Sequence, residues 1–246
     1  TVGGVPGEWI QADGASSDAA VLYLHGGGYV AGSVDSHRNL LGHLAQAMGC
    51  RVFAADYRLA PEHPFPAAVD DAVAAYRAMV ADGLDPSRIA VAGDSAGGGL
   101  TVAMLLALRD EGDPLPAAAM PISAWIDLDG TGESMVTRAD ADPMVTPGSL
   151  SIIGGLYLGE AASTNPLASP INGEMNGLPP MLIQVGDAEV LLDDSVRMAE
   201  RVNDAGGSAR LEVWPEMVHV WHASAGFVPE ADEAIAQLAE FVSTHW

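Results

Sequence analysis

The chain has 246 residues, of which 49% are hydrophobic, so it is long enough for a single α/β domain with a large core. Its 33 acidic side chains outnumber the 10 basic ones and give a formal net charge of −23, which argues against nucleic acid and anionic membranes as partners. No apolar run reaches the roughly 18 residues of a membrane-spanning helix, and the first residues show no charged-then-apolar signal pattern.

The first half of the sequence alternates predicted strands with predicted helices. Residues 19–25 are almost continuously apolar, which is typical of a strand buried on both faces. Three prolines within residues 61–66 exclude a helix or a central strand there, and a helix is predicted to begin directly after them. The predicted strands are residues 8–12, 19–25, 51–55 and 88–92, and the predicted helices are residues 37–48, 66–81 and 100–109.

The second half continues the same alternation around one irregular excursion. Residues 126–160 are rich in Asp, Gly and Pro, and such an insertion between strands predicts a lid. The predicted strands are residues 117–123, 181–185 and 209–214, and the predicted helices are residues 147–157, 193–203 and 229–244. Because strands and helices alternate, the sequence predicts one α/β domain over residues 1–246, with a mostly parallel sheet and helices on both faces.

The segment Gly93-Asp94-Ser95-Ala96-Gly97 joins a predicted buried strand to a predicted helix. Side chains at its two glycines would collide with the neighbouring strand and helix in so sharp a turn. The turn would hold the Ser95 hydroxyl at the top of the sheet and at a helix N-terminus, where amide groups favour developing negative charge. A glycine-rich helix start can also be mere packing, but the strand before it and the helix after it favour a nucleophilic serine.

A second glycine-rich turn, His25-Gly26-Gly27-Gly28, follows the predicted strand of residues 19–25. Consecutive glycines allow close approach of the backbone, and their amides can point at a ligand oxygen. Together with a nucleophilic serine, this pattern predicts an oxyanion loop, whose amides stabilise the negative oxygen of a tetrahedral intermediate. A flexible loop is the alternative interpretation.

A serine nucleophile needs a base and a carboxylate that orients the base, in the chain order serine, acid, histidine. His219 and His222 both follow the last predicted strand, and the residues alone leave both as candidate bases. The acid should follow the strand of residues 181–185, where four carboxylates occur: Asp187, Glu189, Asp193 and Asp194. The last two begin a predicted helix, so helix capping explains them without a catalytic role.

These motifs together resemble the hormone-sensitive-lipase family of the α/β-hydrolases, in its bacterial carboxylesterase subgroup. The resemblance covers essentially the whole chain from Glu8 and rests on five segments in the family's order: residues 25–28, 56–66, 93–97, 189–194 and 219–222. It implies an α/β-hydrolase fold with a small helical lid. It also implies an N-terminal cap, of which the sequence includes almost nothing.

The resemblance further implies a catalytic triad and an oxyanion hole. The triad would consist of Ser95 as nucleophile, Glu189 as acid and His219 as base, and the oxyanion donors would be the amides of Gly26, Gly27 and Ala96. Glu189 falls in the register of the family's acid, which is usually an Asp. This departure keeps Asp187 as the runner-up for the acid.

The implied function is that of a serine carboxylesterase, which hydrolyses short-chain acyl esters through a covalent acyl-enzyme and needs no metal or cofactor. Two alternatives are a non-catalytic protein that binds a small ligand on the same fold, and an amidase or peptidase. The predicted partner is a small ester molecule, without nucleic acid or a membrane span, and a homodimer stays open. Cys50 is the only cysteine, which excludes an intrachain disulfide and predicts a reducing, cytoplasmic location.

Overall fold

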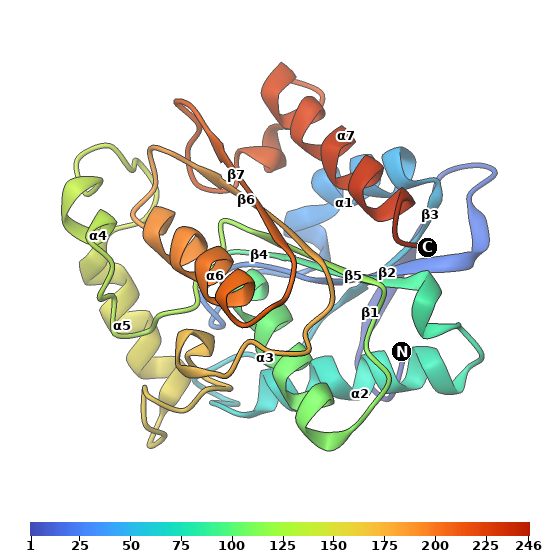
Figure 1. Cartoon of the computed structure of the whole chain (residues 1–246), viewed down its shortest axis with the longest axis horizontal. Helices are drawn as coiled ribbons and strands as arrows, with labels where there is room; N and C mark the ends of the chain where they lie inside the picture. The colour runs from blue at the N-terminus through green and yellow to red at the C-terminus, as the bar shows by residue number, and fades with distance from the viewer.

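The computed structural model describes all 246 residues and has a seven-stranded sheet at its centre (Figure 1). The strand order is β1-β3-β2-β4-β5-β6-β7, and every neighbouring pair is parallel except β1 and β3. The strands are β1 (Gly7–Ile10), β2 (Ser16–Leu24), β3 (Cys50–Ala55), β4 (Ile89–Asp94), β5 (Ala118–Ile122), β6 (Met181–Gly186) and β7 (Ala209–Trp214). The predicted mostly parallel sheet is therefore confirmed.

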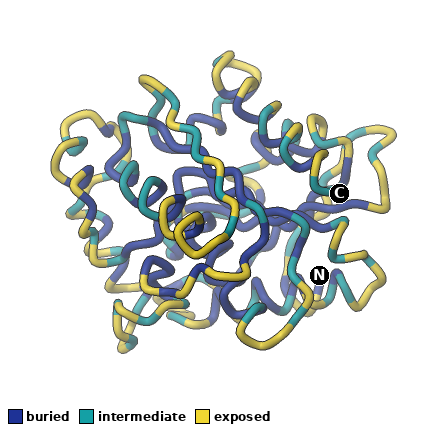
Figure 2. Tube along the Cα trace, viewed as in Figure 1, coloured by how far each residue is buried: buried dark blue, intermediate teal, exposed yellow.

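Helices cover both faces of this sheet, as predicted (Figure 1). One face carries α1 (Val34–Met48) and α7 (Pro229–Ser243), and the other carries α2 (Ala67–Ala81), α3 (Ala96–Glu111) and α6 (Leu192–Asp204). Side chains alternate along a strand, so β2 sends Leu22 into the core on the α3 face and Tyr23 into the core on the α1 face. Figure 2 shows the sheet as a buried central layer between these helices.

Two helices begin earlier than the sequence pattern predicts. α1 begins before the predicted residues 37–48, because Ser33 accepts a hydrogen bond from the Ser36 amide and caps the helix. α3 begins directly after Ser95 and includes three glycines in its first turn. These glycines allow close packing, since a Cβ on Gly97 would collide with the carbonyl oxygen of Leu24 in β2.

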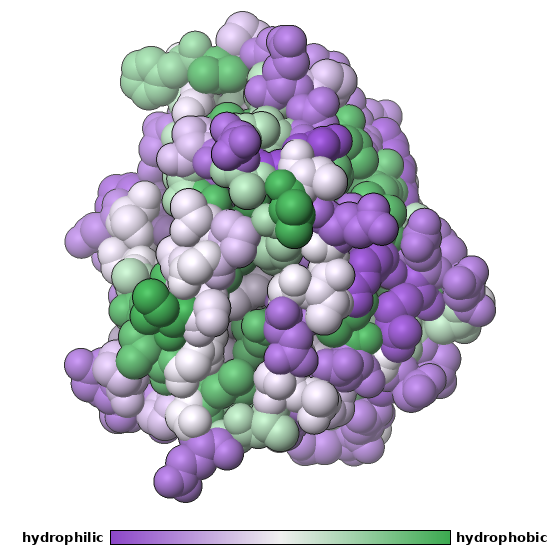
Figure 3. Space-filling model, turned by 90° about the vertical axis from the view of Figure 1, so that its left-hand side faces the viewer, coloured by the Kyte–Doolittle hydropathy of each residue, from purple (hydrophilic) through white to green (hydrophobic).

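The segment between β5 and β6 includes the predicted lid of residues 126–160. It contains α4 (Ser134–Thr137), α5 (Pro147–Leu158) and the 3₁₀ helix η2 (Pro170–Asn172). Tyr157 anchors α5 by stacking on Tyr29, with 3.7 Å between the ring centroids. Figure 3 views the side of α4 and α5, where apolar side chains stand among polar ones around a hollow.

The remaining regular elements are short connections. They are the 3₁₀ helices η1 (Pro86–Arg88), before β4, and η3 (Trp221–Ser224), between β7 and α7. None of the helices in the structure combines the length and the apolar character that a membrane crossing requires.

Candidate active site

Ser95 lies in the tight turn between β4 and α3, where the sequence predicts it. Its backbone φ is 54°, in the left-handed region that residues other than glycine rarely adopt. Two backbone hydrogen bonds hold this conformation: the Ser95 amide donates to the Ile122 carbonyl at 2.8 Å, and the Ser95 carbonyl accepts from the Trp125 amide at 2.9 Å. Ser95 is half-buried between two buried neighbours and lines a cavity, so its hydroxyl can meet a ligand.

His219 follows β7 and contacts Glu189, which follows β6. The His219 Nδ1 atom lies 2.7 Å from Glu189 Oε2, and both side chains are buried. The other carboxylate oxygen of Glu189 accepts hydrogen bonds from the Ser123 hydroxyl and the Gly186 amide, each at 2.7 Å. Because three neighbours hold the Glu189 carboxylate, its orientation is fixed, and the orientation of the His219 ring follows from it.

Ser123 is a site residue that the sequence reasoning missed. It follows β5 with a φ of 45°, and its hydroxyl both donates to Glu189 and accepts from the Val220 amide at 3.2 Å. Ser123 therefore links the carboxylate to the residue directly after His219. A lone serine at the end of an apolar strand carries no sequence signal for this role.

The Glu189 carboxylate determines how His219 titrates. Burial disfavours the charged imidazolium, but the hydrogen bond to Glu189 and its negative charge outweigh burial, and the net effect raises the pKa of His219. The neutral ring is therefore a stronger base than a histidine without such a partner. This is the behaviour required of a group that takes a proton from a serine hydroxyl.

The two alternative residues from the sequence are engaged elsewhere. Asp187 is half-buried, and its Oδ1 atom accepts a hydrogen bond from the Glu216 amide at 2.7 Å. His222 is buried, its Nε2 atom lies 2.8 Å from Gln184 Oε1, and burial lowers its pKa to about 3. Neither Asp187 nor His222 lines the cavity that contains Ser95.

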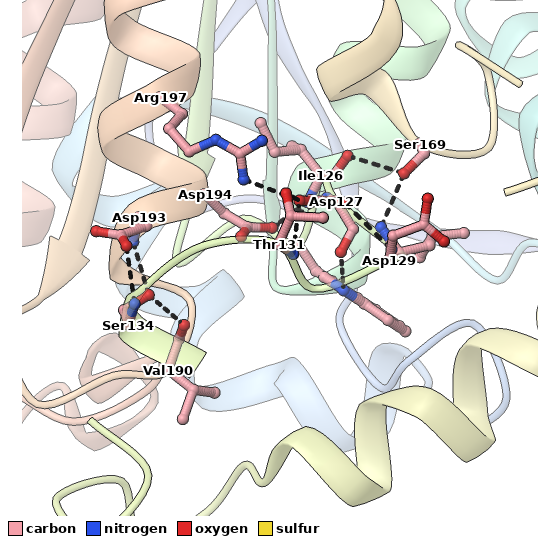
Figure 4. A network of polar contacts seen from close by, with 12 residues as sticks. Ile126, Asp127, Asp129, Thr131, Ser134, Ser169, Val190, Asp193, Asp194 and Arg197 are labelled. Carbon is pink, nitrogen blue, oxygen red and sulfur yellow. Dashed lines mark hydrogen bonds and ion pairs between the residues drawn. The ribbon is translucent and has the colours of Figure 1, made fainter. Parts of the chain in front are cut away.

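The helix-capping interpretation of Asp193 and Asp194 is wrong, because α6 begins without a side-chain cap. Asp194 Oδ2 instead accepts hydrogen bonds from the amides of Ile126 (2.9 Å) and Asp127 (3.0 Å). Asp193 Oδ2 accepts one from the Ser134 amide at 2.8 Å, so both carboxylates reach across to the segment after β5 (Figure 4). Asp194 is fully buried, and burial raises its pKa to about 7.

The network in Figure 4 fastens the start of the inserted segment to α6. Arg197 of α6 pairs with Asp127 Oδ2 at 2.8 Å, and the same oxygen accepts a hydrogen bond from the Thr131 amide at 3.0 Å. α6 begins directly after the loop that carries Glu189. The inserted segment and the carboxylate that contacts His219 therefore share one rigid support.

One of the three amides predicted as oxyanion donors is engaged within the protein. The Gly26 amide donates to Asp94 Oδ1 at 3.0 Å, so it is not available to a substrate oxygen. The amides of Gly27, Gly28 and Ala96 have no hydrogen-bond partner within the protein. The sequence does not distinguish the amides of three adjacent glycines, because only the folded loop decides which of them is engaged within the protein.

A cavity of about 500 Å³ brings the candidate residues together. Ser95, His219 and the glycines of residues 26–28 line it. Its large apolar lining residues come from the segment after β5: Trp125, Met144, Val145, Leu150 and Ile153. Small or polar residues complete the lining, among them Gly32, Ser36, His37 and Ala223. Such a cavity suits a small molecule with one apolar part.

Comparisons with known proteins agree with this geometry. The profile of a family described as having the alpha/beta hydrolase fold matches residues 21–223. An acetyl-hydrolase of Streptomyces hygroscopicus is 47% identical over 245 residues, which are 99% of this chain and 81% of that protein. An ethyl acetate hydrolase of Pseudomonas putida is 34% identical over 242 residues, which are 96% of this chain and 76% of that protein.

Solved structures agree as well. The crystal structure of an esterase from the bacterial hormone-sensitive lipase family matches with a TM-score of 0.98 and 55% identity, over 99% of this chain and 82% of that one. The protein is thus a carboxylic ester hydrolase with the α/β-hydrolase fold. Within this class, the chain belongs to the bacterial hormone-sensitive-lipase family, and the resemblance drawn from its sequence motifs is confirmed.

Proposed function

We propose that this ester hydrolase acts on short-chain acyl esters through a covalent acyl-enzyme, with Ser95 as nucleophile, His219 as base and Glu189 as orienting acid. The observation that carries the proposal is the 2.7 Å contact between Glu189 and His219, since His219 lines the same cavity as Ser95, whose backbone φ is positive. The names of two relatives, an acetyl-hydrolase and an ethyl acetate hydrolase, support a small acyl group.

In the proposed reaction, His219 takes the hydroxyl proton of Ser95 while the serine oxygen attacks the ester carbonyl carbon. The carbonyl oxygen becomes negative and is bound by the free amides of Gly27, Gly28 and Ala96. His219 then donates its proton to the leaving alcohol as the carbon–oxygen bond breaks. A water molecule, activated by the same histidine, hydrolyses the acyl-enzyme and returns Ser95 to its initial state.

The inserted segment of residues 126–160 is proposed to act as the lid that limits chain length. Leu150 and Ile153 of α5 are among the apolar lining residues of the cavity, and Ile153 lies close to the glycine-rich loop at Gly28. We therefore expect the highest kcat/KM among p-nitrophenyl esters at acyl groups from acetyl to hexanoyl. A profile that peaks at dodecanoyl or longer would contradict the proposed lid.

The same assay tests the reaction class. The p-nitrophenyl ester of acetic acid should be hydrolysed, and the p-nitroanilide of the same acid should be at least about a thousandfold slower, because its carbonyl carbon is less electrophilic and its amine is a poorer leaving group than p-nitrophenolate. Comparable rates on ester and anilide would favour an amidase. Saturable binding of the ester without turnover would favour a ligand-binding protein.

The assignment of the acid leads to a sharp comparison between two carboxylates. Glu189→Gln should lower kcat by at least about a thousandfold, because the amide cannot stabilise the His219 imidazolium. Asp187→Asn is the matched control and should lower kcat by less than about tenfold, since Asp187 binds the Glu216 amide instead. Steady-state kinetics with p-nitrophenyl acetate measures both, and the reverse ranking would transfer the role to Asp187.

Two further proposals concern the surroundings of the protein. Cys50 is the only cysteine and is buried, which supports a reducing, cytoplasmic location. Assembly as a homodimer stays a prediction, which sedimentation analysis at several protein concentrations would test.

A further inference from the structure

Asp94, the residue before Ser95, is a buried carboxylate that the proposed reaction does not use. It ends β4, is only 3% exposed and joins three separate elements. Its Oδ1 atom accepts hydrogen bonds from the Tyr23 hydroxyl of β2 at 2.7 Å and from the Gly26 amide at 3.0 Å. Its Oδ2 atom lies 3.2 Å from His37 Nε2 of α1.

The bond to Gly26 connects the nucleophile turn directly to the oxyanion loop. Gly26 is held from both sides of its backbone, because its carbonyl oxygen lies 2.8 Å from His25 Nδ1 while its amide donates to Asp94. The chain then turns at Gly27 and Gly28, whose φ values are 120° and 65°. Fixing Gly26 therefore fixes the starting point from which the next two amides are aimed.

The charge of Asp94 acts on the proposed reaction in two opposite ways. It is among the charges that raise the pKa of His219, which favours the imidazolium formed in the reaction. A carboxylate on the wall of the cavity would repel the negative oxygen of a tetrahedral intermediate. Burial disfavours the charged form of the Asp94 carboxyl group. The contacts to His37, Tyr23 and the Gly26 amide favour the charged form more strongly, so the pKa of Asp94 is lowered. Because these two effects of the charge oppose each other, the contribution of Asp94 to catalysis lies in the position of the groups that it holds.

We infer that Asp94 is a positioning residue, which ties the oxyanion loop to the nucleophile turn and so sets the aim of the Gly27 and Gly28 amides relative to Ser95. The inference rests on the proposed acyl-enzyme reaction. It predicts that the acceptor oxygen at position 94 matters and that its negative charge does not.

Two substitutions separate the acceptor from the charge. Asp94→Asn keeps an oxygen for Tyr23 and Gly26, and its amide group can donate to a neutral His37 ring, so every contact can be retained. Asp94→Ala removes all of these contacts. We expect Asp94→Ala to lower kcat for p-nitrophenyl acetate at least about a hundredfold, the usual effect of losing one oxyanion donor, and Asp94→Asn to lower it by less than about fivefold.

Further measurements distinguish a loss of oxyanion-loop positioning from a general disturbance of the active-site structure. In Asp94→Ala, the KM should change by less than about threefold, while the inhibition constant of a trifluoromethyl ketone should weaken by the same factor as kcat/KM, because only the tetrahedral adduct uses the oxyanion amides. Asp56→Ala is the matched control. Asp56 Oδ1 accepts the Val34 amide at 3.0 Å and so supports α1 without a contact to Gly26. Its kcat should stay within about threefold of the wild-type value.

Gly26→Ala tests the same contact from the other side, because its Cβ would collide with Asp94 Oδ2. Gly26→Ala should also lower kcat at least about a hundredfold, and it tests the inference in place of Asp94→Ala if that variant does not fold.

Equal losses in Asp94→Asn and Asp94→Ala would overturn the inference, as would a kcat within about threefold of wild type in Asp94→Ala. These ratios are measured against an active wild-type enzyme, so a failure of the proposed function would appear separately, as an inactive wild type.

Discussion

Replacement of Ser95 by alanine is expected to lower kcat for p-nitrophenyl acetate by about a millionfold, the usual cost of removing a triad nucleophile. Without the hydroxyl there is no atom in the middle of the cavity that can form the acyl-enzyme. The fold should be unaffected, because the half-buried hydroxyl makes no hydrogen bond within the protein and the turn is held by backbone contacts to Ile122 and Trp125.

The measurement is a steady-state assay together with a thermal unfolding curve of the same preparation. The melting temperature should stay within about 3 °C of the wild-type value, which corresponds to less than about 1 kcal/mol for a domain of this size. A variant that keeps this melting temperature and also keeps kcat within about tenfold of wild type would exclude Ser95 as the nucleophile.

Replacement of His219 by alanine should be nearly as severe, because the loss of the base costs about as much as the loss of the nucleophile. His222→Ala is the matched control, since His222 lies three residues further along and contacts Gln184 rather than Glu189. Its effect on kcat should be less than about tenfold, although its removal leaves the Oε1 atom of the buried Gln184 without a partner and should lower the melting temperature. If the two variants rank in the opposite order, His222 is the base.

The pH dependence gives a second test of His219. The base must be neutral to accept a proton, so kcat/KM should fall as the pH is lowered through the pKa of His219 in the free enzyme. Glu189 raises this pKa, so the acidic limb should lie above the ordinary histidine value of about 6.5. Glu189→Gln should shift the limb to lower pH in its residual activity. A profile that stays flat down to pH 4 would contradict a histidine base.

The strands and helices could be predicted because each carries its own pattern. β7 matches the predicted residues 209–214, and both ends of α5 lie within one residue of the prediction. β2 begins three residues before the predicted strand of residues 19–25, because residues 16–18 are exposed and polar and carry no apolar pattern. Local patterns thus locate the buried part of an element and miss the part that extends into solvent.

The contacts within the site depend on residues far apart in the chain, and the sequence could predict only some of them. The order serine, acid, histidine left four carboxylates and two histidines as candidates beside Ser95. The family resemblance selected Glu189 and His219, and the structure brings these two into contact. The choice among the Gly26, Gly27 and Gly28 amides could not be made, because it depends on Asp94, 68 positions from Gly26.

The role of Asp194 could not be predicted from the sequence either. A carboxylate in the first turn of a predicted helix looks like a cap or a favourable dipole partner. Its actual partners, the amides of Ile126 and Asp127, are 68 and 67 positions away. Residues that serve the fold through such long-range bonds are indistinguishable, in one sequence, from those that act locally.

The most direct test of the proposed acyl-enzyme mechanism is the mass of the enzyme after reaction with diethyl p-nitrophenyl phosphate. This ester phosphorylates an activated serine and releases p-nitrophenolate, and the diethylphosphoryl group stays attached. We predict one such group per chain, located by peptide mapping on Ser95 and formed in parallel with the loss of esterase activity. A fully inactivated enzyme that carries the group on another residue, or an enzyme that hydrolyses p-nitrophenyl acetate but is never labelled at Ser95, would contradict the mechanism.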